Sequence, residues 1–124
     1  MQRIEFVRSY FSYILTNKPR GTLYVGVTNR LIRRIEDHRG GTASAFTRRY
    51  KIHLLVRFEE FQYIDDAIRR ETAIKGWRRD WKVNLIERSN PHWVDLYPQL
   101  PGIRPVPDDW HVTAAKKLGL DEPE

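Results

Sequence analysis

Alternating apolar and polar residues predict a β-hairpin near the start of the chain. Two runs rich in aromatic and β-branched residues span 10–16 and 22–28, and the segment 17–21 between them (NKPRG) is typical of a turn of about five residues. In the second run leucine and valine alternate with other residues, so one face of this strand is apolar. The other face carries Tyr24 beside Gly26.

A helix is predicted to follow the hairpin, from about residue 30 to residue 39. Thr28 or Asn29 can cap its first turn, and Gly40-Gly41 is expected to end it. Two apolar side chains one turn apart would face the core: Leu31 and Ile35. A row of polar side chains is expected on the adjoining face, because positions four apart share one side of a helix. Its members are Arg30, Arg34 and His38.

The next part of the sequence predicts one more strand and two more helices. A polar, basic connector over 42–50 leads to a run over 53–58 that we interpret as a central or core strand. Helices are predicted from about 64 to 77 and from about 79 to 88. The second of them should end before Asn90-Pro91, since a residue that precedes proline resists helical geometry.

A glutamate interrupts the apolar stripe of the helix predicted over 64–77. Glu71 lies three residues from Ile68 and Ile74, so it should face the same way as they do. The stripe comprises Ile64, Ala67, Ile68, Ile74 and Trp77. A buried carboxylate is costly unless it is paired or bound to metal. A salt bridge to a nearby arginine and ligation of a metal ion both explain it.

Composition limits the class of protein. The 124 residues suffice for one domain, and without cysteine there is neither a disulfide framework nor a thiolate metal site, so we expect a cytoplasmic protein. The N-terminal residues predict neither a signal peptide nor a membrane span. The net charge is +6, and residues 1–100 carry 19 Lys and Arg against 11 Asp and Glu. This basic part fits a polyanion, first of all nucleic acid.

The C-terminal residues differ in character from the rest. The segment 98–107 contains four prolines and a glycine, which predicts extended chain. A short peripheral helix is expected over 110–118, and the last residues are expected to be disordered.

The polar residues of the hairpin and the helices could together hydrolyse a phosphodiester. That reaction needs an activated water, compensation of charge on phosphate and help for the leaving oxygen. Arg34 can hold phosphate oxygens in a bidentate manner, and Glu71 suits a hard ion such as Mg²⁺. Each residue also has an ordinary explanation: tyrosines pack well in strands, Arg34 can be solvated, and His38 can complement the helix dipole. Composition and spacing alone therefore indicate a basic domain of mixed helix and strand. They do not identify a reaction.

Several motifs in order resemble the GIY-YIG nuclease superfamily, and more narrowly its small stand-alone bacterial members. They are FSYIL, LYVGVT, RLIRRIEDH, AIRRETAIKGWRRDWKVNLIE and NPHWVDLY. The resemblance implies an α+β fold with a small three-stranded antiparallel sheet flanked by helices. It covers the domain over residues 9–97, which leaves 98–124 as a proline-containing extension that is partly disordered.

The resemblance assigns a role to each candidate residue. Catalytic roles fall to Tyr13, Tyr24, Arg34 and His38, and Glu71 matches the metal-binding glutamate. Substrate contacts are expected from Gly26, Arg30 and Asn90. The sequence departs from the family motifs at Phe11, Ser12 and Val25, where the family role is strand packing.

The implied activity is that of a metal-dependent DNA endonuclease that uses one Mg²⁺ (or Mn²⁺) ion. It would be structure-selective or weakly sequence-specific and act in DNA repair or recombination. The resemblance leaves open which tyrosine acts as the base and whether RNA is also a substrate. We expect a monomer or weak homodimer that does not contact a membrane. The alternatives are a non-catalytic nucleic-acid-binding module of the same fold and an interaction subunit whose proline-containing tail binds a partner.

Overall fold

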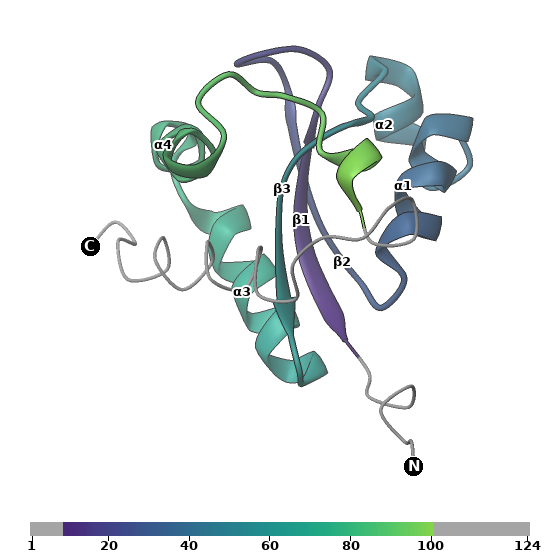
Figure 1. Cartoon of the computed structure of the whole chain (residues 1–124). Helices are drawn as coiled ribbons and strands as arrows, with labels where there is room; N and C mark the ends of the chain where they lie inside the picture. Colours follow the sequence, from purple (N-terminus) through teal and green to yellow (C-terminus); the bar gives the residue numbers. More distant parts are fainter. Residues whose placement is uncertain (1–8, 101–124) are drawn as a thin grey trace.

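The hairpin predicted from the sequence forms the centre of a small antiparallel sheet. In the computed structural model, which describes residues 9–100, this part of the chain forms three strands: β1 (Tyr10–Thr16), β2 (Leu23–Thr28) and β3 (Leu54–Phe61) (Figure 1). The strand order is β2-β1-β3, and β1 pairs antiparallel with both neighbours. The prediction of an α+β fold with a three-stranded antiparallel sheet is confirmed. The central strand is β1 and the third strand lies at an edge of the sheet, but most residues of the third strand are buried. Of the two alternatives for this strand, central was therefore wrong and core is confirmed.

Helices cover both faces of the sheet. Figure 1 shows α1 (Leu31–Gly40) and α2 (Ala45–Tyr50) on one side of it. On the other side lie α3 (Ile64–Gly76) and α4 (Arg79–Ser89). A turn of 3₁₀ helix follows at Tyr97–Gln99. No helix among the described residues is long and apolar enough to cross a membrane.

The core consists of two apolar clusters, one on each face, because successive strand residues point to opposite sides. The cluster under α1 and α2 contains Tyr13, Leu15, Leu31, Ile35, Ile52, Leu55, Phe58, Leu96 and Leu100. The cluster under α3 and α4 contains Ile14, Val25, Val56, Ile74, Val83, Leu85, Ile86 and Trp93. Leu100 is fully buried, so the chain packs against the domain beyond residue 97. The short helix expected over 110–118 lies outside the described residues.

The start of α1 and the connector after it differ from the expectations. Neither Thr28 nor Asn29 caps α1; the cap position is Arg30, and the Thr28 hydroxyl accepts a hydrogen bond from the Arg30 backbone N–H (3.0 Å). The expected connector contains α2. Ser44 caps α2, because its Oγ accepts from the backbone N–H groups of Phe46 and Thr47.

The apolar stripe expected on α3 was wrong at two positions. Ile64 and Ile68 are 48% and 44% exposed, whereas the buried residues of α3 include two charged ones. The buried set is Ala67, Arg70, Glu71 and Ile74. The helix is thus turned so that an arginine and a glutamate, rather than two isoleucines, face the sheet.

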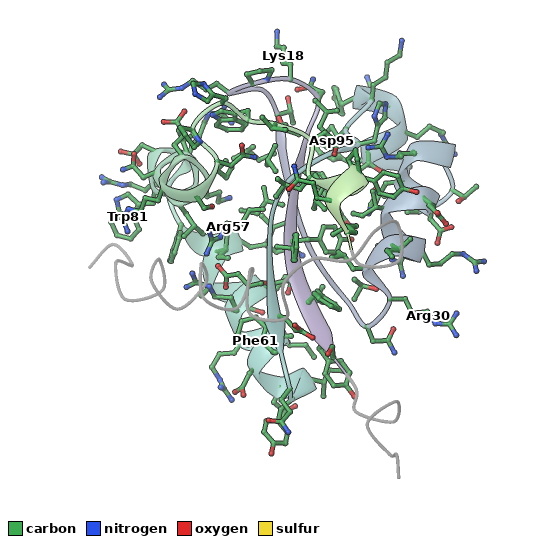
Figure 2. All side chains as sticks on the ribbon, viewed as in Figure 1. Lys18, Arg30, Arg57, Phe61, Trp81 and Asp95 are labelled. Atoms are coloured by element: carbon green, nitrogen blue, oxygen red, sulfur yellow. The ribbon has the colours of Figure 1, made fainter. Side chains whose placement is uncertain are left out.

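Buried ion pairs explain this orientation. The carboxylate of Glu59 on β3 accepts hydrogen bonds from Arg57 (Nε, 2.9 Å) and from Arg70 of α3 (Nε, 2.8 Å), and all three side chains are buried. Arg57 points to the α3–α4 side of the sheet (Figure 2) and also donates to Ser89 Oγ. Although burial alone would raise the pKa of Glu59, the two guanidinium groups hold it below its ordinary value. The cluster fixes α3 against β3 through three charges that are each hydrogen-bonded.

We expect Glu59→Gln to lower the free energy of unfolding by about 3 to 5 kcal/mol, because it removes the buried carboxylate that pairs with two buried guanidinium groups. Urea unfolding followed by circular dichroism measures this. The matched control is Asp66→Asn, which removes a carboxylate of α3 that pairs with Arg69 at the surface and should change stability by about 0.5 kcal/mol or less. Equal effects of the two substitutions would contradict a structural role for the cluster.

Candidate active site

Tyr13 lies across Gly26 on the neighbouring strand. The two residues face each other in the β1–β2 register. A Cβ atom at position 26 would lie 2.4 Å from Tyr13 Oη and 2.5 Å from Cζ, which is much closer than van der Waals contact. Gly26 is therefore required by the close approach of the ring, and the space that we expected a substrate to use is filled by Tyr13.

A chain of buried hydrogen bonds starts at the Tyr13 hydroxyl. Its oxygen lies 3.0 Å from His38 Nε2, and His38 Nδ1 lies 3.0 Å from Thr47 Oγ1. The Thr47 hydroxyl in turn donates to the backbone carbonyl of Ser44 (3.2 Å). This chain links β1, α1 and α2 in the interior of the protein.

The direction of these bonds fixes the tautomer of His38. A threonine hydroxyl has one proton, which Thr47 gives to a carbonyl that can only accept, so its oxygen must accept from His38 Nδ1–H. A neutral imidazole with its proton on Nδ1 has an acceptor at Nε2. Tyr13 is consequently a phenol that donates its proton to His38.

Tyr24 completes an aromatic cluster around His38. Its ring centroid lies 5.1 Å from that of His38 and 6.4 Å from that of Tyr13. The rings of Tyr13 and His38 are 5.8 Å apart, and the pairs with His38 are edge-to-face. Three of the residues that the sequence singled out therefore meet in space.

The charges of Arg34 and Glu71 both act on this cluster. Burial raises the pKa of Tyr13 well above its ordinary value; the neighbouring Tyr24 and Glu71 add to this effect, whereas Arg34 opposes it. The pKa of His38 falls to about 4, because the ring is buried and the Arg34 guanidinium disfavours a second cation. Both groups are therefore in their neutral forms at pH 7.

Glu71 supplies a carboxylate at this site from α3. It is 9% exposed, and its Oε2 lies 2.5 Å from Nζ of Lys75 one turn later, so its partner is a lysine rather than the arginine that we considered. Among residues 9–100, no group of three histidine, cysteine or acidic side chains is placed to hold a metal ion. A lone carboxylate fits Mg²⁺, which keeps several waters and binds proteins through one or two carboxylates. Lys75 is half exposed and can turn away, so the residues fit such an ion.

A groove at the start of α1 joins Arg34 to the surface. It has a volume of about 220 Å³. Its lining consists of Thr28, Asn29, Arg30, Arg33, Arg34 and Asp37. Arg30 is exposed and points away from the sheet (Figure 2). Three guanidinium groups beside one carboxylate make this groove suitable for an anion.

Asn90 forms structural hydrogen bonds at the end of α4. Its Nδ2 donates to the carbonyls of Val56 (3.1 Å) and Val94 (2.9 Å), and its Oδ1 accepts from the Val94 N–H (2.9 Å). The side chain is buried, and its amide group forms hydrogen bonds with backbone groups. These hydrogen bonds account for an asparagine at this position even if it contacts no substrate.

Thr47 is the residue of the site that sequence reasoning missed. It lies in a segment that we interpreted as a connector, where a threonine has no distinctive pattern. The one available signal was Ser44, whose type and position are typical of a helix cap ahead of Phe46 and Thr47.

Comparison with known proteins agrees with the sequence motifs. A family model described as the GIY-YIG catalytic domain matches residues 9–84. This chain belongs to the GIY-YIG family. Nucleases of the GIY-YIG family typically depend on a divalent metal ion. Tyr13, Tyr24, Arg34, His38 and Glu71 all lie within the matched residues.

Curated relatives and a solved structure carry the name UPF0213. A UPF0213 protein of Pediococcus pentosaceus is 29% identical over 75% of this chain and 97% of its own length. One from Clostridium perfringens is 40% identical over 61% of this chain and 81% of its own length. The NMR structure of a UPF0213 protein from Bacillus halodurans is 27% identical, with a TM-score of 0.46 over 73% of this chain and 95% of that one.

We expect Gly26→Ala to break the Tyr13–His38 hydrogen bond of this GIY-YIG protein, because the new methyl group and the tyrosine ring cannot share the same space. NMR shifts of the His38 imidazole should change, and stability should fall by about 1 to 3 kcal/mol. The control is Gly40→Ala, where a Cβ meets nothing within 4 Å. If Gly26→Ala leaves the His38 signals unmoved, Tyr13 is not held as described.

The lowered pKa of His38 predicts a specific pH dependence of stability. The unfolded chain binds a proton near pH 6.5 and the folded protein only near pH 4, so stability is complete above about pH 6.5 and falls as the pH drops towards 4. The loss attributable to this 2%-exposed ring is about 3 kcal/mol at most. Urea unfolding between pH 7.5 and 4 should show it in the native chain and much less in His38→Gln. Substitution of the exposed His92 by Gln should retain the full dependence.

Proposed function

We propose that this protein is a metal-dependent endonuclease that hydrolyses DNA phosphodiesters. The observation that carries the proposal is the Tyr13–His38–Thr47 hydrogen-bond chain, on whose phenol the charges of Arg34 and Glu71 both act. The matched family domain supports a nuclease fold.

Glu71 is the residue that would hold the metal ion, and we propose one Mg²⁺ or Mn²⁺. The bound ion would neutralise charge on the phosphate and on the leaving oxygen. For this the Glu71 carboxylate must exchange Lys75 for the ion. Because Lys75 is half exposed, its ammonium group can be solvated after the exchange.

The Tyr13–His38 pair can remove a proton from the attacking water. The oxygen of Tyr13 accepts that proton while its own proton passes along the 3.0 Å hydrogen bond to His38 Nε2. Tyr13 thereby need not become a phenolate, which its raised pKa disfavours. Of the two tyrosines this favours Tyr13 as the base, with Tyr24 packed beside it on His38.

Arg34 would bind the scissile phosphate from the groove at the start of α1. A bound phosphate would also offset the positive charge that lowers the pKa of His38, so the imidazole becomes a better proton acceptor when substrate is present. Arg30 lines the same groove and would contact a neighbouring phosphate. The excess of basic residues over the first 100 positions suits such a polyanion.

The substrate that we propose is DNA, cleaved in a structure-selective or weakly sequence-specific manner. The enzyme would act as a monomer or weak homodimer, in DNA repair or recombination in the cytoplasm. The ion pair between Glu71 and Lys75 favours the second candidate, a nucleic-acid-binding module that does not cut. Cleavage separates the two.

We expect the purified protein to nick DNA with Mg²⁺ or Mn²⁺, and expect Glu71→Gln and Arg34→Ala each to lower the rate by about 100-fold or more. A panel of duplex, single-stranded, flap and branched DNA, each with and without EDTA, measures this. Circular dichroism establishes that each variant is folded.

Matched controls lie on α3, away from the groove. Asp66→Asn removes an exposed carboxylate, and Arg69→Ala removes the exposed arginine that pairs with it. Both should keep at least about a third of the native rate, since neither charge acts on Tyr13 or His38. The absence of cleavage with every substrate and ion would overturn the enzyme in favour of the binding module.

A further inference from the structure

A row of aromatic rings leads from His38 to the surface of α2. The ring of Tyr24 stacks on Phe46, with centroids 6.4 Å apart and planes at 29°. Phe46 contacts Tyr50 one turn further along (4.9 Å), and the guanidinium of Arg49 lies 5.4 Å from the Tyr50 ring. We call Phe46 and Tyr50 the aromatic platform.

The aromatic platform is exposed although it is apolar. Phe46 and Tyr50 are each 44% exposed. On the same short helix Thr47 is fully buried and hydrogen-bonded to His38. The helix therefore holds the platform outward while its inner side is anchored to the hydrogen-bond chain of the site, so the platform and the site keep a fixed separation.

Basic residues adjoin the platform in the sequence, without acidic residues nearby. No aspartate or glutamate occurs between Asp37 and Glu59. Arg48 and Arg49 lie on α2, and Lys51 follows it. Within residues 9–100 no carboxylate forms an ion pair with any of these three cations. An exposed apolar surface with this charge fits a partner that is both aromatic and anionic.

We propose that the aromatic platform stacks an unpaired nucleobase of a bound nucleic acid strand. This rests on the proposed function and makes it more specific: the strand would run from Arg34 across α2, with phosphates near Arg48, Arg49 and Lys51. Bases within a duplex are already stacked on each other, so such a platform favours single-stranded or frayed nucleic acid. A second copy of this chain is a poor occupant, because two such cationic surfaces repel each other.

The test is binding without cleavage. The native protein in EDTA is titrated into a single-stranded DNA oligonucleotide that contains 2-aminopurine, whose fluorescence is quenched by stacking, and into a fully paired duplex of the same length. The variant Phe46→Leu with Tyr50→Leu keeps an apolar surface but lacks aromatic faces. Tyr50→Leu alone leaves the Phe46–Tyr24 contact intact, and Tyr63→Leu alters an exposed aromatic residue next to α3 as the control.

We expect quenching by the native protein and by Tyr63→Leu, and loss of quenching with about tenfold weaker single-strand binding in the double variant. Tyr50→Leu should lie between them, and duplex binding should change by about twofold or less.

Unchanged quenching and affinity in the double variant would overturn the proposal, as would an equal loss for duplex and single strand. A change in sedimentation without a change in DNA binding would assign the platform to a second copy instead. Quenching by a protein that never cuts would overturn the proposed enzyme and leave this inference standing.

Discussion

The buried hydrogen bond from Tyr13 to His38 sets the positions of the elements around it. It joins the central strand to α1, and the bond from His38 to Thr47 extends the connection to α2. Gly26 has no side chain because the Tyr13 ring needs that space to reach His38. Each polar side-chain atom of Tyr13, His38 and Thr47 has a hydrogen-bond partner. A buried network needs this if it is to fix one arrangement. The same network gives the phenol and the imidazole defined roles as donor and acceptor.

Charges of opposite sign reach this network from two elements. Arg34 comes from α1, and Glu71 comes from α3, which also packs against the sheet. The orientation of α3 depends on the ion pair of Arg70 with Glu59 of β3. Arg70 directly precedes Glu71, so this pair also fixes the position of Glu71. A buried ion-pair cluster thus accounts for where the carboxylate lies. The proposed metal chemistry relies on that placement.

Much of the fold could be predicted because its signals are local. The hairpin has a turn sequence between alternating strands, and His38 and Arg34 are one helical turn apart. The family resemblance added the convergence of Tyr13, Tyr24 and His38, which periodicity could not give. Two of the predictions that failed depended on features that periodicity does not show. The burial of Arg70 and exposure of Ile68 depend on ion pairs with a distant strand, and periodicity assumes that arginine faces water. The α2 helix is only six residues long and basic, so Thr47 was not visible as a partner of His38.

The protonation of His38 tests the central claim of this account most directly. Two-dimensional ¹⁵N–¹H NMR of the imidazole at neutral pH distinguishes a nitrogen that carries a proton from one that does not. We expect a neutral ring with the proton on Nδ1 and an unprotonated Nε2, to which Tyr13 donates. A proton on Nε2, or a doubly protonated ring, would contradict it, because Tyr13 could then no longer pass its proton to His38.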